Sequence, residues 1–151
     1  MEVEFRKYRS SDFEDLALMV LGLYSKDGQK ATHMTTEKVA LSVENLTGPM
    51  SLGQIFIFEK GGVSIGYSIV NRFWSNEFSG QILYVDELYV KPEYRSLGIG
   101  AQFFDFLQTN LENHSVAFML ETMHDNKKAI EFYKKIGFTP HHNYLMFKQL
   151  A

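Results

Sequence analysis

Residues 85–101 constrain the fold of the chain most strongly, because a strand, a turn and a helix follow one another there without a gap. Its first part is rich in Leu, Tyr and Val, and Pro92 ends the predicted strand. Gly98 and Gly100 come next, followed by apolar residues at helical spacing up to Leu111. Glycine lets a ligand approach the backbone closely, and the start of a helix offers unpaired N–H groups and a positive dipole end. The stretch therefore predicts a turn that can bind a pyrophosphate.

The glycine spacing alone leaves the ligand of this turn open. A glycine pair after a strand is also a common start of a helix, so a purely structural turn is an alternative interpretation. The nucleoside triphosphate pattern Gly-x-x-x-x-Gly-Lys-Ser/Thr does not occur in the chain, and the third glycine of the dinucleotide pattern is missing.

Strand and helix patterns fill the rest of the chain and predict a mixed α/β fold with the order β-α-α-β-β-β-α-β-α-β. Strands are predicted at residues 3–8, 55–58, 63–74, 81–91, 116–122 and 144–147, of which 116–122 is expected to be buried. Helices are predicted to begin at a capping box in residues 11–14, at Thr35 or Thr36, at Gly98, and at Asp125 or Asn126. The first and the last helix should end at Gly28 and Gly137. Because no repeat or linker interrupts these patterns, we expect a single domain over residues 1–151.

The charge balance and the lack of cysteine exclude several kinds of function. The chain has 15 Lys and Arg residues against 18 Asp and Glu residues, a net charge of -3, which does not favour a nucleic-acid partner. Without cysteine there is no disulfide, thiolate metal site or cysteine nucleophile, and the five histidines lack the spacing of metal ligands, so no metal is expected. No signal peptide or membrane span is recognisable, and we expect a cytoplasmic protein that does not bind membranes.

Two motifs resemble those of a known family. Arg95-x-x-Gly98-x-Gly100 after a Leu-Tyr-Val strand and a proline is similar to the acetyl-CoA signature of the GNAT N-acetyltransferases. The second half of that family's pattern is matched in order by Asn126, Ala129, Phe132, Tyr133, Gly137 and Phe138. The resemblance covers about residues 63–138, and Ser96 stands where Gly or Gln is commoner. It implies the GNAT fold, with a mostly antiparallel central sheet flanked by helices, and acetyl-CoA as the acetyl donor.

The resemblance also implies which residues bind the cofactor. Backbone groups of Leu88 and Val90 would contact the acetyl and pantetheine part, and the Arg95 guanidinium would add a contact to the pyrophosphate. Alternatively, Arg95 is an ordinary surface charge and Asn126 only a helix N-cap. The full set of cofactor-binding candidates is Leu88, Tyr89, Val90, Arg95, Ser96, Leu97, Gly98, Ile99, Gly100, Ala101, Asn126, Ala129, Phe132 and Tyr133.

Tyr133 is the candidate general acid. A phenol with a pKa of ~10 is protonated at neutral pH and can return a proton to the leaving CoA thiolate. Tyr133 and Asn126 are seven residues apart, so they share one face of the predicted helix and can line one ligand channel. The alternative is a tyrosine that merely packs between helix and sheet.

Three carboxylates are candidates for the general base that deprotonates the amine, in the order Asp86, Glu121 and Glu87. Adjacent strand residues point to opposite faces, so at most one of Asp86 and Glu87 should face a given pocket, and Asp86 should share its face with Tyr84 and Leu88. By resemblance, Glu121 lies where some protein N-terminal acetyltransferases carry their base. Each of these carboxylates could instead pair with a Lys or Arg on the sheet.

Aromatic and acidic side chains together favour an ammonium as the acceptor. The candidate substrate-binding residues are Tyr24, Phe73, Trp74, Phe78, Tyr84 and Asp86. We expect a small primary amine, namely a polyamine-like compound, an amino sugar or an amino acid, and the segment 84–87 resembles that of diamine acetyltransferases. The alternatives are a protein or peptide acetyltransferase, a non-catalytic CoA-binding module, or an interaction domain. Family members often dimerise, so a homodimer is possible.

Overall fold

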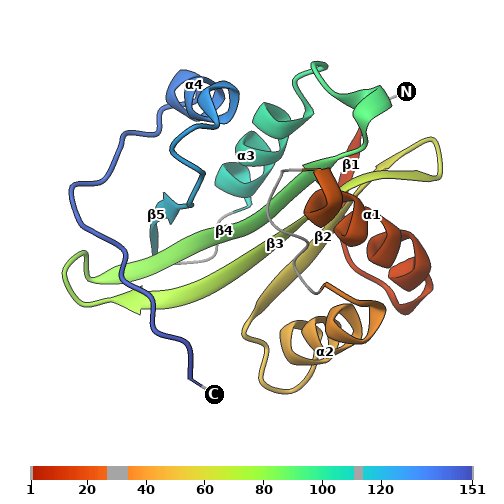
Figure 1. The fold of residues 1–151 in the computed structure, drawn as a ribbon, viewed down its shortest axis with the longest axis horizontal. Helices are drawn as coiled ribbons and strands as arrows, with labels where there is room; N and C mark the ends of the chain where they lie inside the picture. The colour runs from red at the N-terminus through yellow and green to blue at the C-terminus, as the bar shows by residue number, and fades with distance from the viewer. Residues whose placement is uncertain (1, 27–33, 111–113, 151) are drawn as a thin grey trace. The chain divides into compact units, whose positions relative to one another are not determined.

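In the part of the chain that the structure describes, five strands form one sheet and lie side by side in their order along the chain (Figure 1). They are β1 (Glu4–Lys7), β2 (Gly53–Lys60), β3 (Val63–Ser75), β4 (Gly80–Val90) and β5 (Ser115–Met119). Neighbouring strands pair antiparallel, except that β4 and β5 pair parallel. The prediction of a mostly antiparallel sheet is thereby confirmed.

In this computed structural model the described residues are 2–26, 34–110 and 114–150, and within them four α-helices accompany the sheet. The helices are α1 (Phe13–Lys26), α2 (Thr36–Thr47), α3 (Ile99–Thr109) and α4 (Lys127–Lys135). Short 3-10 helices, η1 and η2, occur at Ser10–Asp12 and Pro92–Tyr94. The predicted helix end at Gly28 and the apolar residue Leu111 lie outside the described residues.

The chain forms two compact units, Met1–Glu121 with the sheet and α1 to α3, and Thr122–Ala151 with α4. None of the helices in the described part of the chain is long and apolar enough to cross a membrane. The expectation of one domain over the whole chain stays a prediction.

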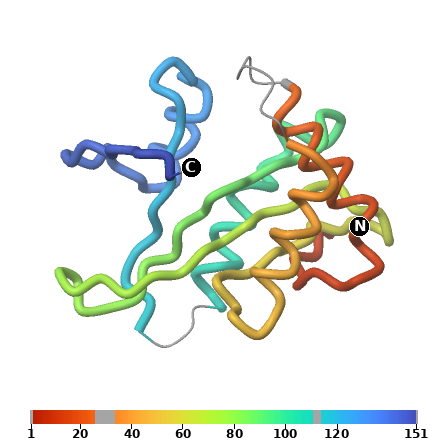
Figure 2. The backbone as a smooth tube through the Cα atoms, turned by 60° about the horizontal axis from the view of Figure 1, so that its bottom comes forward, coloured from red at the N-terminus to blue at the C-terminus, as the bar shows by residue number. Residues whose placement is uncertain are grey.

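In the first unit, α1 and α2 cover one face of the sheet and α3 covers the other (Figures 1 and 2). Leu16, Met19 and Val20 of α1 lie at the helical spacing i, i+3, i+4, and each is at most 3% exposed. They share a buried cluster with Ile55 and Ile57 of β2. Burying a side chain of this size contributes about 1.5–3 kcal/mol, so this apolar stripe holds α1 on the sheet.

Aromatic rings fill the space between the sheet and α3. Phe103 of α3 is 0% exposed, and its ring lies 4.7 Å from that of Phe58 and 5.5 Å from those of Phe5 and Phe56. Phe106, one turn later, lies 5.5 Å from Phe5. These edge and tilted contacts fasten α3 to β1 and β2.

The first helix begins differently from the prediction, because Asp12 takes the role expected of the capping box. The Asp12 carboxylate accepts a hydrogen bond of 2.7 Å from the backbone N–H of Arg9 and pairs with Arg6 at 2.8 Å. Arg6 also pairs with Glu59 of β2 at 2.7 Å. The Arg6 guanidinium lowers the pKa of Asp12, and the three charges join β1, β2 and the start of α1.

One strand prediction in the last part of the chain was wrong, and so was the burial predicted for another strand. Residues 144–147 form no strand, and all four are 73–96% exposed. A strand exists only where its backbone pairs with a neighbour, which an apolar run alone does not ensure. The predicted strand 116–122 exists as β5, but none of its residues is buried, because β5 is the edge of the described sheet.

Phe103→Ala should lower the free energy of unfolding by about 3–5 kcal/mol, because it leaves a cavity among the five aromatic rings that contact it. Phe73→Ala, at a side chain that is 46% exposed, is the matched control and should cost about 1 kcal/mol or less. Urea unfolding of both variants measures the difference. Equal losses of unfolding free energy in Phe103→Ala and Phe73→Ala would contradict the assignment of the aromatic core.

Candidate active site

A β-bulge in β4 determines where the candidate carboxylates point. Ile69 of β3 lies opposite Glu87, whereas Val70 lies opposite Val85, so Asp86 is an extra residue without a partner on β3. Residues on either side of a bulge no longer follow the simple alternation of a strand. The predicted rule that Asp86 and Glu87 point to opposite faces was therefore wrong.

The register also corrects the predicted neighbours of Asp86. Tyr84 lies opposite Asn71 and Leu88 lies opposite Ser68, and these two β3 positions are three residues apart. They therefore point to opposite faces, so Tyr84 and Leu88 do not share a face as expected. By the same register, Tyr84 shares its face with Glu87, on the side of α1 and α2.

Glu87 is held by two tyrosines from different elements. The hydroxyl of Tyr24, near the end of α1, donates a 2.5 Å hydrogen bond to Oε1, and the hydroxyl of Tyr67, on β3, donates a 2.8 Å bond to Oε2. The Ser68 hydroxyl donates to the backbone carbonyl of Glu87 at 2.7 Å. Burial raises the pKa of Glu87, although the two tyrosine hydrogen bonds act to lower it. Glu87 thus joins α1, β3 and the bulge.

Asp86 remains in contact with solvent at the bulge. Surrounding protein atoms nevertheless desolvate it enough to raise its pKa, and the carboxylate of Glu121 raises that pKa further. Glu121 follows β5 and accepts a hydrogen bond from the Tyr84 hydroxyl. Burial raises the pKa of Tyr24, and Glu87 and then Asp86 raise it further, so the two carboxylates act on the same hydroxyl. The structure brings Asp86, Glu87, Glu121, Tyr24 and Tyr84 together as an acidic cluster.

The acidic cluster lies where β4 and β5 separate. Their parallel pairing ends at Tyr84 opposite Met119, whereas β4 continues to Val90. Backbone groups of residues 85–90 on that edge have no partner from β5, as expected for a strand that splays from its neighbour. The Val90 carbonyl accepts a 2.8 Å hydrogen bond from Nε of Arg95.

The turn between β4 and α3 has the geometry that the glycines predicted. Gly98 is the N-cap of α3, and its φ of 74° lies in the left-handed region that glycine adopts without strain. As a glycine, this N-cap makes no side-chain bond to the helix, which leaves the first N–H groups of α3 suited to an anion. Ser96 also has a positive φ, 63°. The Arg95 guanidinium lies 5.5 Å from the centre of the Tyr89 ring, which places its charge beside the turn.

In the second unit, Asn126 and Tyr133 both have local structural roles. The Asn126 side chain accepts a 3.2 Å hydrogen bond from the N–H of Ala129, so the alternative of an N-cap is confirmed for it. The Tyr133 ring packs 5.0 Å from Phe132 and 5.6 Å from Phe138, and burial raises its pKa. The contact of Asn126 with pantetheine and the role of Tyr133 as general acid stay predictions.

Not all predicted substrate residues join the acidic cluster. Phe73 and Trp74 are 46% and 63% exposed near the end of β3, and Trp74 lies opposite Gln81. That position is five residues from Asp86 along β4, or roughly 16 Å. Phe78, 52% exposed, lies in the connection that follows β3.

Sequence reasoning missed Tyr67. Among the apolar residues of β3 it resembles any core aromatic, and it is indeed 0% exposed. Only its hydroxyl, which points to Glu87, distinguishes it. A strand pattern carries no signal for such a contact, because it depends on which residue of another strand lies next to it.

Tyr67→Phe should lower the free energy of unfolding by about 1–3 kcal/mol at pH 8, since the half-buried carboxylate of Glu87 loses a donor. The pKa of Glu87 is raised in the folded protein. The negative charge of Glu87 therefore destabilises the fold as the pH rises through this folded pKa, and the cost is absent below the pKa of the unfolded chain. The loss should therefore shrink toward pH 4. Urea unfolding at both pH values, with Tyr89→Phe as the buried control on the same face, measures it; a pH-independent loss would contradict the role of Glu87.

Comparisons with known proteins agree with this geometry. A family model described as the Acetyltransferase (GNAT) family matches residues 26–138. A thialysine N-epsilon-acetyltransferase of Sus scrofa is 33% identical over 79 residues, which are 52% of this chain and 46% of that protein, and one of Mus musculus is 30% identical over the same length. The match thus spans about half the length of these curated relatives.

Solved structures show the same fold. A possible acetyltransferase from Clostridium difficile 630 has a TM-score of 0.83 at 18% identity and covers 100% of this chain and 99% of its own. The aminoglycoside N-acetyltransferase AAC(6')-Iy in complex with CoA has a TM-score of 0.75 at 17% identity, covering 99% and 96%. Together with the family model, which matches most of the sequence, this means that the chain belongs to the GNAT acetyltransferase family.

Proposed function

We propose that this protein transfers the acetyl group of acetyl-CoA to a primary amine of a small molecule. The observation that carries the proposal is the acidic cluster at the bulge, beside the edge of β4 that β5 leaves unpaired. In this arrangement the proposed base lies next to the backbone of β4 that β5 leaves exposed. Membership of the GNAT family supports the reaction type.

The residues of the first unit fit acetyl-CoA as the donor. The uncapped N–H groups at the start of α3, after Gly98, suit its pyrophosphate, and Arg95 adds a positive charge beside them. The backbone of residues 88–90 that β5 leaves unpaired, apart from the Val90 carbonyl that accepts from Arg95, suits the amides of the pantetheine arm. When bound, acetyl-CoA supplies the acetyl group as a thioester.

The chain's own residues then have distinct roles. Asp86 accepts the proton that the ammonium must lose before the amine nitrogen can attack the acetyl carbon; its raised pKa makes it a better base near neutral pH. A β4 backbone N–H stabilises the negative charge on the acetyl oxygen. For Tyr133, in the second unit, the proposed role stays that of the general acid, which would supply the proton that the sulfur takes up as the C–N bond forms and the C–S bond breaks. Burial raises the pKa of Tyr133, which keeps the phenol protonated until then.

A small amine is the acceptor that the acidic cluster suits best. Carboxylates and tyrosine rings attract an ammonium, and Tyr24, Tyr84 and the three acids meet at one place. The curated relatives are named for acetylation of thialysine, and a structural neighbour is named for aminoglycosides. We therefore propose a polyamine-like compound, an amino sugar or an amino acid as the substrate class.

Acetyl-CoA in hundredfold excess over its dissociation constant should stabilise the folded protein by about 2.7 kcal/mol, seen as a higher thermal midpoint. Gly98→Asp should abolish this shift, because it places a carboxylate where the pyrophosphate binds. Gly62→Asp is the matched control, since Gly62 has a similar φ of 78° in a hairpin turn. Gly62→Asp should keep the shift; loss of the shift in both variants, or its retention in Gly98→Asp, would contradict the binding site.

Asp86→Asn should lower kcat/KM for a small amine by about 10²–10⁴ while leaving the thermal shift with acetyl-CoA intact. Asp105→Asn, the same change on the exposed side of α3, should have no effect. Release of CoA thiol with a panel of small amines and with peptides measures the activity. Turnover of peptides alone would point to a protein acetyltransferase, and acetyl-CoA binding without turnover of either would point to a binding module.

A further inference from the structure

Tyr89, near the end of β4, connects the core under α1 with the turn that precedes α3. Its side chain is only 7% exposed and belongs to the buried cluster that contains Leu16 and Met19 of α1. The Arg95 guanidinium lies 5.5 Å from the centre of the Tyr89 ring, within the range of a cation–π contact. One ring thus contacts both the buried core and the exposed arginine of the turn.

Two neighbours restrict the position of the Tyr89 ring. Tyr67 lies opposite Tyr89 on β3, and the centres of the two rings are 5.9 Å apart. Gly22 of α1 leaves room for the phenol, because a Cβ at this position would lie 2.9 Å from the Tyr89 hydroxyl oxygen. Since Tyr67 itself is 0% exposed, the Tyr89 ring has little freedom to move, and it offers Arg95 a fixed surface.

Arg95 is held at two places along its side chain. Its Nε donates a 2.8 Å hydrogen bond to the Val90 carbonyl, and its guanidinium carbon lies over the Tyr89 ring. The hydrogen bond uses only Nε, whereas a guanidinium has four further N–H donors on its two Nη atoms. These donors suit a phosphate, and a guanidinium that is already held in place loses less rotamer freedom when it binds one.

We propose that Tyr89 is a positioning residue, whose ring holds the Arg95 guanidinium where it contacts the pyrophosphate of acetyl-CoA. The inference rests on the proposed binding of acetyl-CoA at the turn between β4 and α3. It adds a function for the side chain of Tyr89, which acts on the cofactor through Arg95. The core packing of the same ring is what makes this function possible.

The first test separates the ring of Tyr89 from the rest of the donor site. Tyr89→Leu should weaken the binding of acetyl-CoA roughly two- to fivefold in isothermal titration calorimetry, whereas Tyr89→Phe, which keeps the ring, should restore it. S-acetylpantetheine carries the same thioester and pantetheine arm without any phosphate, and its affinity, measured by titration of the ¹⁵N-labelled full chain, should be the same in the wild type and in Tyr89→Leu. Equal losses for the two donors would overturn the inference, and urea unfolding checks that each variant folds.

The second test is a double-mutant cycle with Arg95. Arg95→Gln should weaken the binding of acetyl-CoA several-fold, because a charge-assisted contact is lost. In the Arg95→Gln background, Tyr89→Leu should cause no further loss, since it acts through the missing guanidinium. A purely structural role of Tyr89 would lower the affinity again by the same factor, and such additive losses would refute the positioning role.

The third test needs no cofactor and no variant. In the free wild-type protein, nuclear Overhauser effects should connect the side-chain protons of Arg95 with the ring protons of Tyr89, and their absence would overturn the inference. The outcomes also separate this inference from the proposed function. A wild-type protein that binds no acetyl-CoA would refute the donor site itself, whereas binding that Tyr89→Leu leaves unchanged would refute only the role of Tyr89.

Discussion

The extra residue in β4 is the constraint on which the acidic cluster depends. Asp86 has no partner on β3, so the alternation of side chains shifts by one position between Val85 and Glu87. Without the shift, Glu87 would share the α3 face with Val85, among aromatic rings that offer no donor. With the shift, Glu87 reaches Tyr24 and Tyr67. Asp86 then lies next to Glu87 on β4, near the point where the pairing with β5 ends.

The tyrosine hydroxyls explain how the fold tolerates buried negative charge. A carboxylate buried without hydrogen bonds costs several kcal/mol, and Glu87 avoids much of this cost through two donors from α1 and β3. Asp86 has no such pair, and its raised pKa reflects incomplete solvation next to Glu121. An incompletely solvated carboxylate suits proton transfer but does not stabilise the fold, and this combination is common at catalytic positions.

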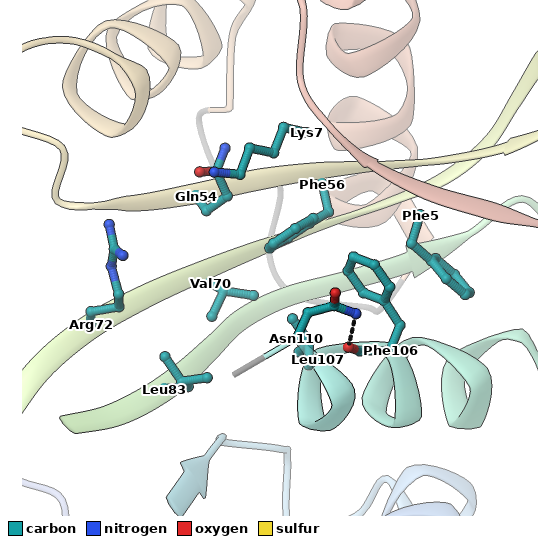
Figure 3. Close-up of a pocket in the computed structure, with 10 residues that line it drawn as sticks. All are labelled: Phe5, Lys7, Gln54, Phe56, Val70, Arg72, Leu83, Phe106, Leu107 and Asn110. Carbon is teal, nitrogen blue, oxygen red and sulfur yellow. Dashed lines mark hydrogen bonds between the residues drawn. The ribbon is translucent and has the colours of Figure 1, made fainter. Parts of the chain in front are cut away.

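The packing on the other face of the sheet positions the turn between β4 and α3. α3 starts at Gly98, and Phe103, four residues after the first residue of the helix, is buried among rings of β1 and β2. Rotation or translation of α3 would break these contacts, so the aromatic core also holds the free N–H groups of the helix start in place. A pocket lined by residues of β1 to β4 and of the end of α3 lies on the same face of the sheet (Figure 3).

The local patterns of the sequence were sufficient for most elements. The hairpin of β2 and β3, the strand before Pro92, the left-handed Gly98 and the caps at Thr35 and Asn126 all follow from turn and cap preferences of single residues. The two motifs also sufficed for the family, because they mark a turn whose backbone geometry only a few residue types allow. The strand predicted at residues 144–147 failed because its pattern does not say whether a partner strand is present.

What the sequence by itself determined, therefore, is the order of the elements through α4, the glycine turn before α3 and the set of candidate acids. Only the tertiary structure decided which acids meet, since the bulge at Asp86 is a property of the pairing of two strands rather than of either strand. It likewise decided that Tyr67 belongs to the site and that Trp74 lies about 16 Å away along the sheet. Side-chain neighbours across strands depend on register, and register follows from the packing of the whole sheet against its helices, which a local pattern does not contain.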